Sequence, residues 1–174
     1  MRINVDGTRN LARACRQCDA AMAYISTDYV FSGEGEKPFE TDDPKAPQNV
    51  YGESKLLGEQ AMLEELPQRI YIIRTSWVYG LNGKNFVKTM LRLGAEKDEI
   101  RVVCDQIGSP TYTVDLAAAL CDLLEKNAYG VYHCTNEGFC SWYEFTKEIM
   151  RLSSLKRKII PVATVDYPTA AKRP

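Results

Sequence analysis

The chain has 174 residues, of which 45% are hydrophobic and 26% are charged, and its formal net charge at pH 7 is −1. This size and balance predict a folded globular protein with a real core and exclude a disordered chain. The sequence has neither an apolar run of the roughly 18 to 20 residues that cross a bilayer nor a signal-peptide layout. It also lacks the basic and aromatic clusters of nucleic-acid surfaces. We therefore expect a cytoplasmic protein with neither a membrane nor a nucleic acid as partner.

The cysteines predict free thiols. They lie mostly in apolar segments, where we expect small buried side chains of a protein in a reducing compartment. Cys15 and Cys18 form a C-x-x-C pattern, but no second pair accompanies it and the chain has a single histidine, so no zinc or other metal site is predicted. The six cysteines are Cys15, Cys18, Cys104, Cys121, Cys134 and Cys140.

The first half of the chain alternates helix and strand. Apolar residues at helical spacing predict a helix over about residues 5–15, followed by a short buried strand over 22–26. A polar loop with glycine and proline follows over about 28–49. A second helix is expected from about 50 to 65, and Pro67 marks its end.

The second half continues the alternation. We expect strands over 69–74, 100–104 and 130–134, and helices over 85–95, 114–126 and from Ser141 onward. The last helix opens with a capping box, in which Ser141 is followed three residues later by Glu144. Strands that alternate with helices imply right-handed crossovers and an α/β fold with a parallel sheet covered on both faces.

The strongest chemical signal is a Tyr-x-x-x-Lys pattern formed by Tyr51 and Lys55 on the second predicted helix. Residues four apart share one helix face, so the phenol and the ammonium can point into the same cleft. A free tyrosine has a pKa of about 10, and a neighbouring cation lowers it by favouring the phenolate. The pattern is common by chance, and an ordinary Tyr–Lys pair on a helix surface is the alternative interpretation.

Ser26 and Thr27 strengthen the catalytic interpretation of that pattern. Thr27 is expected at the carboxyl end of a buried strand, where open parallel sheets gather their ligands. Its hydroxyl could hydrogen-bond a substrate carbonyl there. The joint occurrence of Thr27, Tyr51 and Lys55 favours a catalytic site.

Several stretches, in order along nearly the whole chain, closely resemble the dTDP-4-dehydrorhamnose reductases, a family of extended short-chain dehydrogenases. Residues 4–12 resemble the helix before the catalytic strand of these enzymes. The further matching stretches are 26–33, 49–56, 74–79, 105–111 and, near the end, Ala171-Lys172-Arg173-Pro174. The resemblance implies part of a Rossmann-like doubly wound parallel sheet with a small C-terminal α/β substrate-binding part. Residues 1–80 would belong to the dinucleotide-binding domain with the catalytic residues, and 81–174 mostly to the substrate-binding region, interleaved with the Rossmann sheet.

The resemblance also implies an activity, namely reduction of the C4 ketone of dTDP-4-dehydro-L-rhamnose to dTDP-L-rhamnose by NADPH or NADH. Tyr51 would donate the proton to the carbonyl oxygen and would bind the cofactor together with Lys55. Lys55 would lower the phenol's pKa and hold the nicotinamide ribose. Thr27 would hydrogen-bond the same oxygen, and Thr27 and Asp28 would contact the sugar. Trp77 would border the substrate pocket with a flat apolar face; its alternative role is that of a core aromatic.

Related reactions remain open. Nucleotide-sugar epimerases and dehydratases share the Tyr-x-x-x-Lys pattern, but dehydratases typically carry Asp-Glu after the threonine, whereas here Asp28 is followed by Tyr29. One proton donor and one hydride donor suffice for carbonyl reduction, which the sequence therefore favours. A non-catalytic regulatory relative is a further alternative, against which the intact Thr27, Tyr51 and Lys55 argue.

The glycine-rich turn that holds pyrophosphate in these enzymes has no counterpart in the chain. Gly33 and Gly35 follow the catalytic strand and predict a turn rather than a phosphate cradle. We therefore expect a fragment, or an incomplete gene model, that binds cofactor poorly by itself. The choice between NADPH and NADH, a use of magnesium, and a homodimeric state are left open by the sequence.

Overall fold

A computed structural model describes residues 1–35 and 37–167, so the family-like ending at 171–174 lies outside the described residues. The chain divides into two compact units. The first comprises Met1–Thr75 and Ala118–Cys134, and the second comprises Ser76–Ala117 and the described residues after Cys134. The division of function predicted near residue 80 stays a prediction.

The first unit is built on a parallel three-stranded sheet in the order β1-β2-β7. The middle strand β2 is buried along its whole length. Thr27 and Thr75 face each other across β1 and β2, so both strands carry their carboxyl ends to the same edge. The elements of this unit are the π-helix η1 (Arg2–Gly7), α1 (Thr8–Gln17), β1 (Met22–Thr27), the 3-10 turn η2 (Asp28–Val30), α2 (Val50–Glu65), β2 (Ile70–Thr75) and β7 (Gly130–His133).

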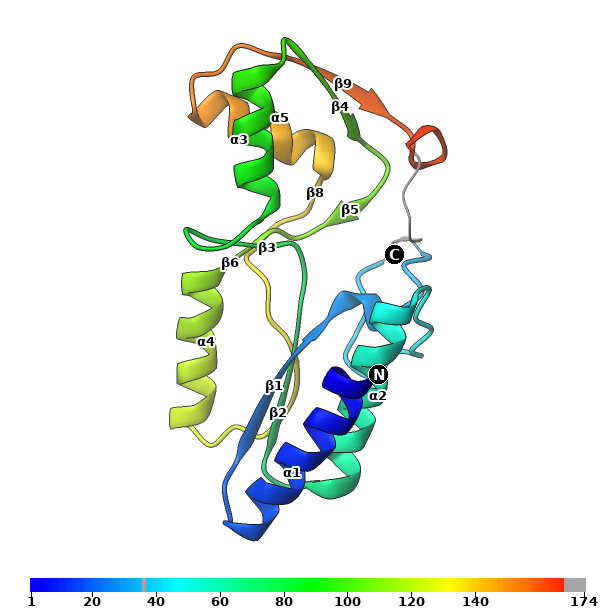
Figure 1. The fold of residues 1–174 in the computed structure, drawn as a ribbon, viewed down its shortest axis with the longest axis vertical. Helices are drawn as coiled ribbons and strands as arrows, with labels where there is room; N and C mark the ends of the chain where they lie inside the picture. Colours follow the sequence, from blue (N-terminus) through cyan, green and yellow to red (C-terminus); the bar gives the residue numbers. More distant parts are fainter. Residues whose placement is uncertain (36, 168–174) are drawn as a thin grey trace. The chain divides into compact units, whose positions relative to one another are not determined.

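Helices α1 and α2 lie side by side along the sheet (Figure 1). Apolar side chains of both helices meet those of β1 and β2 in one core cluster. Around this cluster, three arginines of α1 pair with the carboxylate of Glu65 on α2. The buried members of the cluster are Ala12, Tyr24, Met62, Leu66, Ile70 and Ile72.

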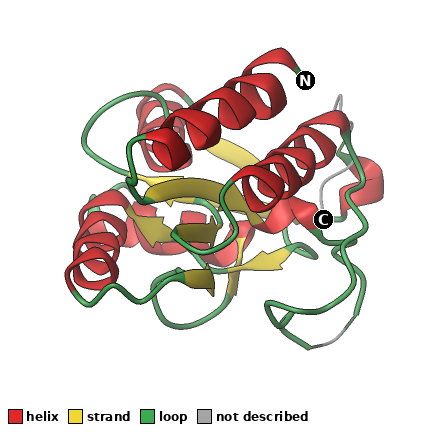
Figure 2. Cartoon of the chain, turned by 90° about the horizontal axis from the view of Figure 1, so that it is seen from below, coloured by secondary structure: helices red, strands yellow, loops and turns green. Residues whose placement is uncertain are grey.

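The second unit holds three two-stranded sheets and two helices that share a separate core. Strands β3 and β6 pair parallel, β4 and β9 pair parallel, and β5 and β8 pair antiparallel. The elements are β3 (Val78–Tyr79), α3 (Phe86–Glu96), β4 (Glu99–Val103), β5 (Ile107–Gly108), β6 (Thr111–Tyr112), β8 (Cys140–Ser141), α5 (Trp142–Leu152), β9 (Lys158–Val162) and the 3-10 turn η3 (Thr164–Asp166). Helix α4 (Thr113–Glu125) runs through both units. Figure 2 shows these helices in red and the strands in yellow.

The helices and longer strands confirm the predicted α/β alternation, and the capping box of Ser141 and Glu144 is present at the start of α5. Two expectations need correction. The strand predicted at 100–104 forms, as β4, but pairs with β9 instead of joining the main parallel sheet. The cysteines are free thiols, but none is fully buried, and Cys18 and Cys121 are exposed.

No helix in the described residues is long and apolar enough to span a membrane.

Candidate active site

Thr27 ends strand β1 with a buried side chain whose hydroxyl is fixed by its neighbours. The hydroxyl donates to Asp28 Oδ1 at 2.9 Å and accepts from the backbone N–H of Tyr29 at 3.3 Å. The second bond caps the turn η2, because a threonine oxygen at this position satisfies a backbone donor that would otherwise lack a partner. The end of the strand therefore presents one oriented hydroxyl.

Tyr51 lies in the first turn of α2, near the same hydroxyl. The side chain of Asn49 accepts from the backbone N–H of Gly52 at 2.9 Å and starts the helix there. A Cβ on Gly52 would overlap the carbonyl oxygen of Tyr29, so glycine lets the helix start pack against η2. The Thr27 hydroxyl lies close enough to the Tyr51 phenol to affect its pKa, and the Tyr51 ring stands edge-on to that of Tyr29 at 5.6 Å. The structure thus brings Thr27, Asp28 and Tyr51 together.

The pKa of Tyr51 corrects one expectation. Burial raises this pKa above its usual value of 10, and the charge of Asp28 raises it further, while the neighbouring Thr27 hydroxyl opposes both effects. The predicted lowering by Lys55 does not occur in this structure, because the ammonium lies over the ring of Tyr24. Tyr51 is therefore a protonated phenol at neutral pH.

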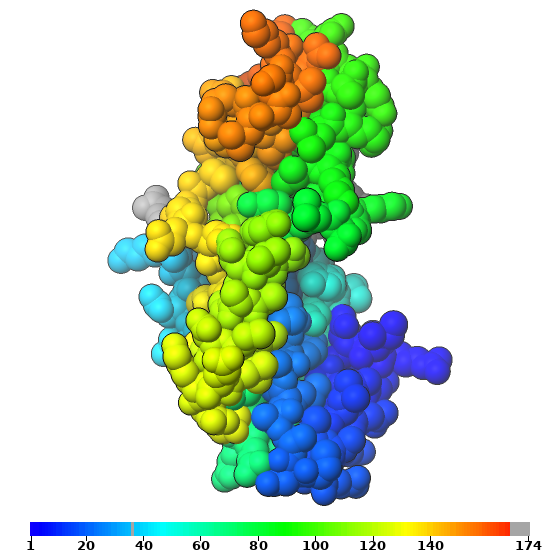
Figure 3. All heavy atoms as spheres, turned by 90° about the vertical axis from the view of Figure 1, so that its left-hand side faces the viewer, coloured from blue at the N-terminus to red at the C-terminus, as the bar shows by residue number. Residues whose placement is uncertain are grey.

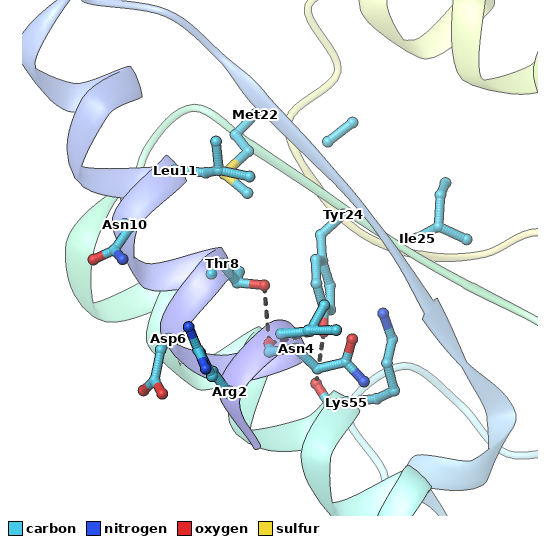
Figure 4. Close-up of a pocket in the computed structure, with 13 residues that line it drawn as sticks. Arg2, Asn4, Asp6, Thr8, Asn10, Leu11, Met22, Tyr24, Ile25 and Lys55 are labelled. Carbon is cyan, nitrogen blue, oxygen red and sulfur yellow. Dashed lines mark hydrogen bonds between the residues drawn. The ribbon is translucent and has the colours of Figure 1, made fainter.

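Lys55 projects into an open hollow of about 750 Å³ beside β1 (Figure 4). Its ammonium lies 3.8 Å from the centre of the Tyr24 ring. Within the described part of the chain, no carboxylate lies within ion-pair distance of this ammonium. Burial lowers the pKa of Lys55, and the nearby charge of Glu59 partly offsets that effect.

The hollow is walled by η1, the start of α1 and the strand β1, all of which lie on the surface shown in Figure 3. Apolar side chains are exposed here, with Ile3 at 85%, Leu11 at 60% and Ile25 at 42%. An ammonium without an acceptor suits the hydroxyls of a ribose, since it offers three donors. Gly33 and Gly35 lie in the loop after η2, and a Cβ on Gly35 would meet nothing within 4 Å. The described residues therefore fit the ribose end of a nicotinamide cofactor but form no cradle for its phosphates.

Asp28 yields a pH prediction, because burial raises its pKa from 3.8 to about 6 despite the bond from Thr27. A carboxyl group whose pKa is raised by folding binds more protons in the folded state, so stability falls as pH rises from about 4 to 6. Asp28→Asn removes this ionisation. We expect the variant to gain stability over the native chain as pH rises through this window, by at most about 3 kcal/mol above pH 6.

Urea unfolding of both proteins at pH 4, 5, 6 and 7.5 measures this difference. A constant difference between the two free energies of unfolding over that range would contradict the raised pKa of Asp28.

Trp77 belongs to the second unit, where its ring stacks on Trp142 at 3.4 Å between ring centres. Its φ of 48° lies in the left-handed region, which a bulky residue occupies only when its surroundings impose it. A Cβ on Gly108 would come within 2.6 Å of the indole, so this glycine leaves the space that the ring fills. The role of Trp77 at the substrate remains a prediction.

A buried ion pair between Glu59 and Arg74 lies next to the site, and the sequence patterns above did not predict it. Glu59 receives two bonds from the Arg74 guanidinium, at 3.0 and 2.7 Å, and a further short bond from the Ser26 hydroxyl. Arg74 also donates to the carbonyl oxygen of Thr41 at 2.8 Å. One cation therefore joins α2, β2 and the loop after η2, next to the strand end that carries Thr27.

A signal for these contacts was present in the sequence. Glu59 stands four residues after Lys55, on the same helix face, and Arg74 closes an otherwise apolar strand. Gly52 and Gly58 lie within the continuous helix α2. Because glycine costs about 1 kcal/mol in a helix, their presence indicates that other groups approach the helix closely there. A Cβ on Gly58 would overlap the Tyr24 hydroxyl.

Acidic, histidine and cysteine side chains form no group of three or more that could hold a metal ion in residues 1–35 and 37–167.

Comparison with known proteins places this geometry in a family. The sequence model described as "RmlD substrate binding domain" matches residues 1–174. The chain is 48% identical to the spore coat polysaccharide biosynthesis protein SpsK of Bacillus subtilis (strain 168) over 172 residues, which cover 99% of this chain and 60% of that protein. It is 43% identical to the dTDP-4-dehydrorhamnose reductase of Streptomyces griseus, with 100% of this chain and 59% of that enzyme covered. The chain thus spans about 60% of the length of the curated relatives it matches.

A solved structure of a dTDP-4-dehydrorhamnose reductase has the same fold as this chain. The dTDP-4-dehydrorhamnose reductase of Bacillus anthracis str. Ames, in complex with NADP, superimposes with a TM-score of 0.95 at 47% identity, covering 98% of this chain and 60% of that one. The predicted Rossmann-like α/β fold is confirmed by this likeness and by that to the NAD-bound dTDP-glucose 4,6-dehydratase of the same organism, at a TM-score of 0.79, 22% identity, and 92% and 55% coverage. Matched over its whole length, the chain belongs to the RmlD substrate binding domain family, as the resemblance to dTDP-4-dehydrorhamnose reductases predicted.

Proposed function

We propose that this chain carries the proton-donating site of a reductase that converts the C4 ketone of dTDP-4-dehydro-L-rhamnose to the alcohol of dTDP-L-rhamnose. The observation that carries the proposal is the close grouping of Thr27, Asp28 and Tyr51 at the carboxyl end of β1. Open parallel sheets bind their ligands at this edge. The names of the matching reductases support the substrate class.

The two hydroxyls divide the work on the carbonyl oxygen. The Tyr51 phenol, protonated at neutral pH, donates its proton to the oxygen as the ketone carbon is reduced. The Thr27 hydroxyl holds the same oxygen by turning its single proton from Asp28 to the substrate, while the bond that it accepts from the Tyr29 backbone keeps its position. The positions of both groups are set before the substrate binds, which is the main contribution of a protein to such a step.

A nicotinamide cofactor supplies the hydride when bound. Lys55 would hold its ribose, since the ammonium faces the hollow without a carboxylate partner among the described residues. The NADP bound to the reductase of Bacillus anthracis supports NADPH as the cofactor. We further propose that residues 1–80 bind the cofactor and carry the catalytic residues, and that residues 81–174 mainly bind the sugar nucleotide. Trp77, just before this boundary, would also contact the sugar nucleotide.

The test requires a segment that can bind the phosphates of the cofactor, which the described residues do not provide. We would fuse the chain to the segment of the Bacillus anthracis reductase that it does not cover, since the two agree at a TM-score of 0.95. The chimera is expected to oxidise NADPH only when dTDP-4-dehydro-L-rhamnose is present. The 174-residue chain alone is expected to show little turnover.

Product analysis separates the alternatives. A single product, dTDP-L-rhamnose, supports the proposal, whereas an epimerised or dehydrated nucleotide sugar without net NADPH oxidation contradicts it. A folded chimera that binds NADPH but leaves the keto sugar unchanged would favour a non-catalytic relative. The relative named dTDP-4-keto-6-deoxy-D-glucose reductase, at 41% identity, makes that ketone the second substrate to assay.

A further inference from the structure

Tyr24 of β1 contacts the ammonium that the proposed function assigns to the cofactor ribose. The Lys55 Nζ lies over the face of the Tyr24 ring, 3.8 Å from its centre (Figure 4). An ammonium this close to an aromatic face is attracted by the negative electrostatic potential of the ring. Tyr24 itself is buried, with 8% of its surface exposed, so the ring belongs to the core while its face borders the hollow.

The Tyr24 ring is fixed at its hydroxyl end. The hydroxyl donates to the backbone oxygens of Asn4 in η1, at 3.4 Å, and of Lys55 in α2, at 3.5 Å. A Cβ on Gly58 would overlap this hydroxyl, so the missing side chain lets the ring lie against α2. Two elements and a glycine therefore determine where the ring stands, and the ammonium lies over its face.

Several charged and titratable groups surround Lys55, and they act in different directions. Burial disfavours its charged form, whereas Glu59, one turn further along α2, favours it. The face of an aromatic ring also favours the charged form. The groups that share the helix face or the hollow with Lys55 are Tyr51 and Glu59 from α2, Tyr24 from β1, and Arg2 and Asp6 from η1.

We propose that Tyr24 is a positioning residue of this site, whose ring face holds the Lys55 ammonium at the hollow beside β1. Its part in catalysis rests on the proposed function, but the contact itself does not. Without the ring, the ammonium would lose a favourable partner and would move more freely around its four-carbon stem. The ring thus keeps the charge in one place before a ribose arrives.

The contact is tested in the native 174-residue chain by NMR with lysine labelled at 13Cε and 15Nζ. The Lys55 signal is assigned from the spectrum of Lys55→Arg. Because protons above an aromatic face are shielded, the Lys55 ε-protons are expected upfield of those of the other lysines. Lys55 ε-protons at the position of the other lysines would overturn the proposal, and this measurement needs no variant that folds poorly.

Two variants then test the consequence for ionisation. Tyr24→Leu keeps an apolar side chain but removes the ring face, and is expected to lower the pKa of Lys55 by about half to one and a half units, a three- to thirtyfold change in the protonation equilibrium. Tyr24→Phe keeps the ring and loses only the hydroxyl, and is expected to leave that pKa within about 0.2 units of the native value. Equal effects of leucine and phenylalanine would overturn the proposal.

The chimera provides the functional measurement. With Tyr24→Leu we expect a higher KM for NADPH and a shifted pH profile, and with Tyr24→Phe neither. If the NMR results hold but the chimera reduces no ketone, the proposed function fails and the contact stands. If the chimera is active and Tyr24→Leu changes neither KM nor the pH profile, the positioning role fails alone.

Discussion

Replacing Arg74 by methionine is expected to lower the free energy of unfolding by about 3 to 5 kcal/mol. The guanidinium is 4% exposed and its partner Glu59 is 2% exposed, so the pair lies in the interior of the first unit. Methionine has a similar length but no charge, and it would leave the Glu59 carboxylate buried with only the Ser26 hydroxyl as a donor. Such an uncompensated charge is costly because the interior solvates it poorly. Urea unfolding of the 174-residue chain measures the loss.

Two matched variants show whether the cost comes from the unpaired charge. The double variant Glu59→Leu and Arg74→Met removes both charges and is expected to recover most of the stability, since replacing a whole buried pair is often nearly neutral. Arg92→Met breaks an exposed pair with Glu96 on α3 and should cost less than about 1 kcal/mol. If Arg74→Met costs no more than Arg92→Met, the buried pair does not hold the site together as described.

The helix that carries the site could be predicted almost completely from the sequence. Its predicted limits, about 50 to 65, are those of α2. The reason is local: Asn49 caps the first turn, Pro67 follows the last, and the spacing of Tyr51 and Lys55 requires no tertiary information. Strands β1 and β2 were predicted to within one residue at either end for the same reason, since short apolar runs between turn signals mark buried strands.

The sheets of the second unit could not be predicted in this way. Four of their six strands are only two residues long, which is too short for any alternation to be recognised. Strand β9 contains Pro161, a residue that argues against a strand in the sequence but is tolerated where a sheet has only two strands. Pairing between β4 and β9 joins residues about sixty positions apart, which no local pattern encodes.

The surroundings of the candidate catalytic groups depend on such long-range contacts as well. The motif predicts that Lys55 shares a face with Tyr51, but the ring that receives its ammonium comes from Tyr24, 31 residues earlier in the chain. The pKa of Tyr51 is raised mainly by burial, which the sequence does not reveal. The neighbouring cation, which the sequence does reveal, does not set the direction of this shift. Spacing predicts which groups can meet, whereas packing decides which one the charge contacts.

In the chimera, Tyr51→Phe is expected to lower kcat by about 10² to 10⁴-fold, the usual contribution of a positioned proton donor. Phenylalanine keeps the ring that stands edge-on to Tyr29 and removes only the hydroxyl that Thr27 contacts. Binding of NADPH should change less than kcat, because Lys55, whose ammonium lies over the Tyr24 ring, is unaltered. Steady-state NADPH oxidation with the keto sugar measures kcat, and fluorescence titration measures cofactor binding.

Tyr129→Phe is the matched control, since Tyr129 is also partly exposed, at 38%, but precedes β7 at the opposite end of the sheet. Its kcat should equal that of the unmodified chimera.

The pH profile adds a second criterion: the Tyr51 phenol is protonated at neutral pH and burial raises its pKa above 10, so the reduction rate should fall only above the usual range of a tyrosine. If Tyr51→Phe keeps the native kcat, or loses it together with Tyr129→Phe, the proton comes from another group and the assignment of Tyr51 fails.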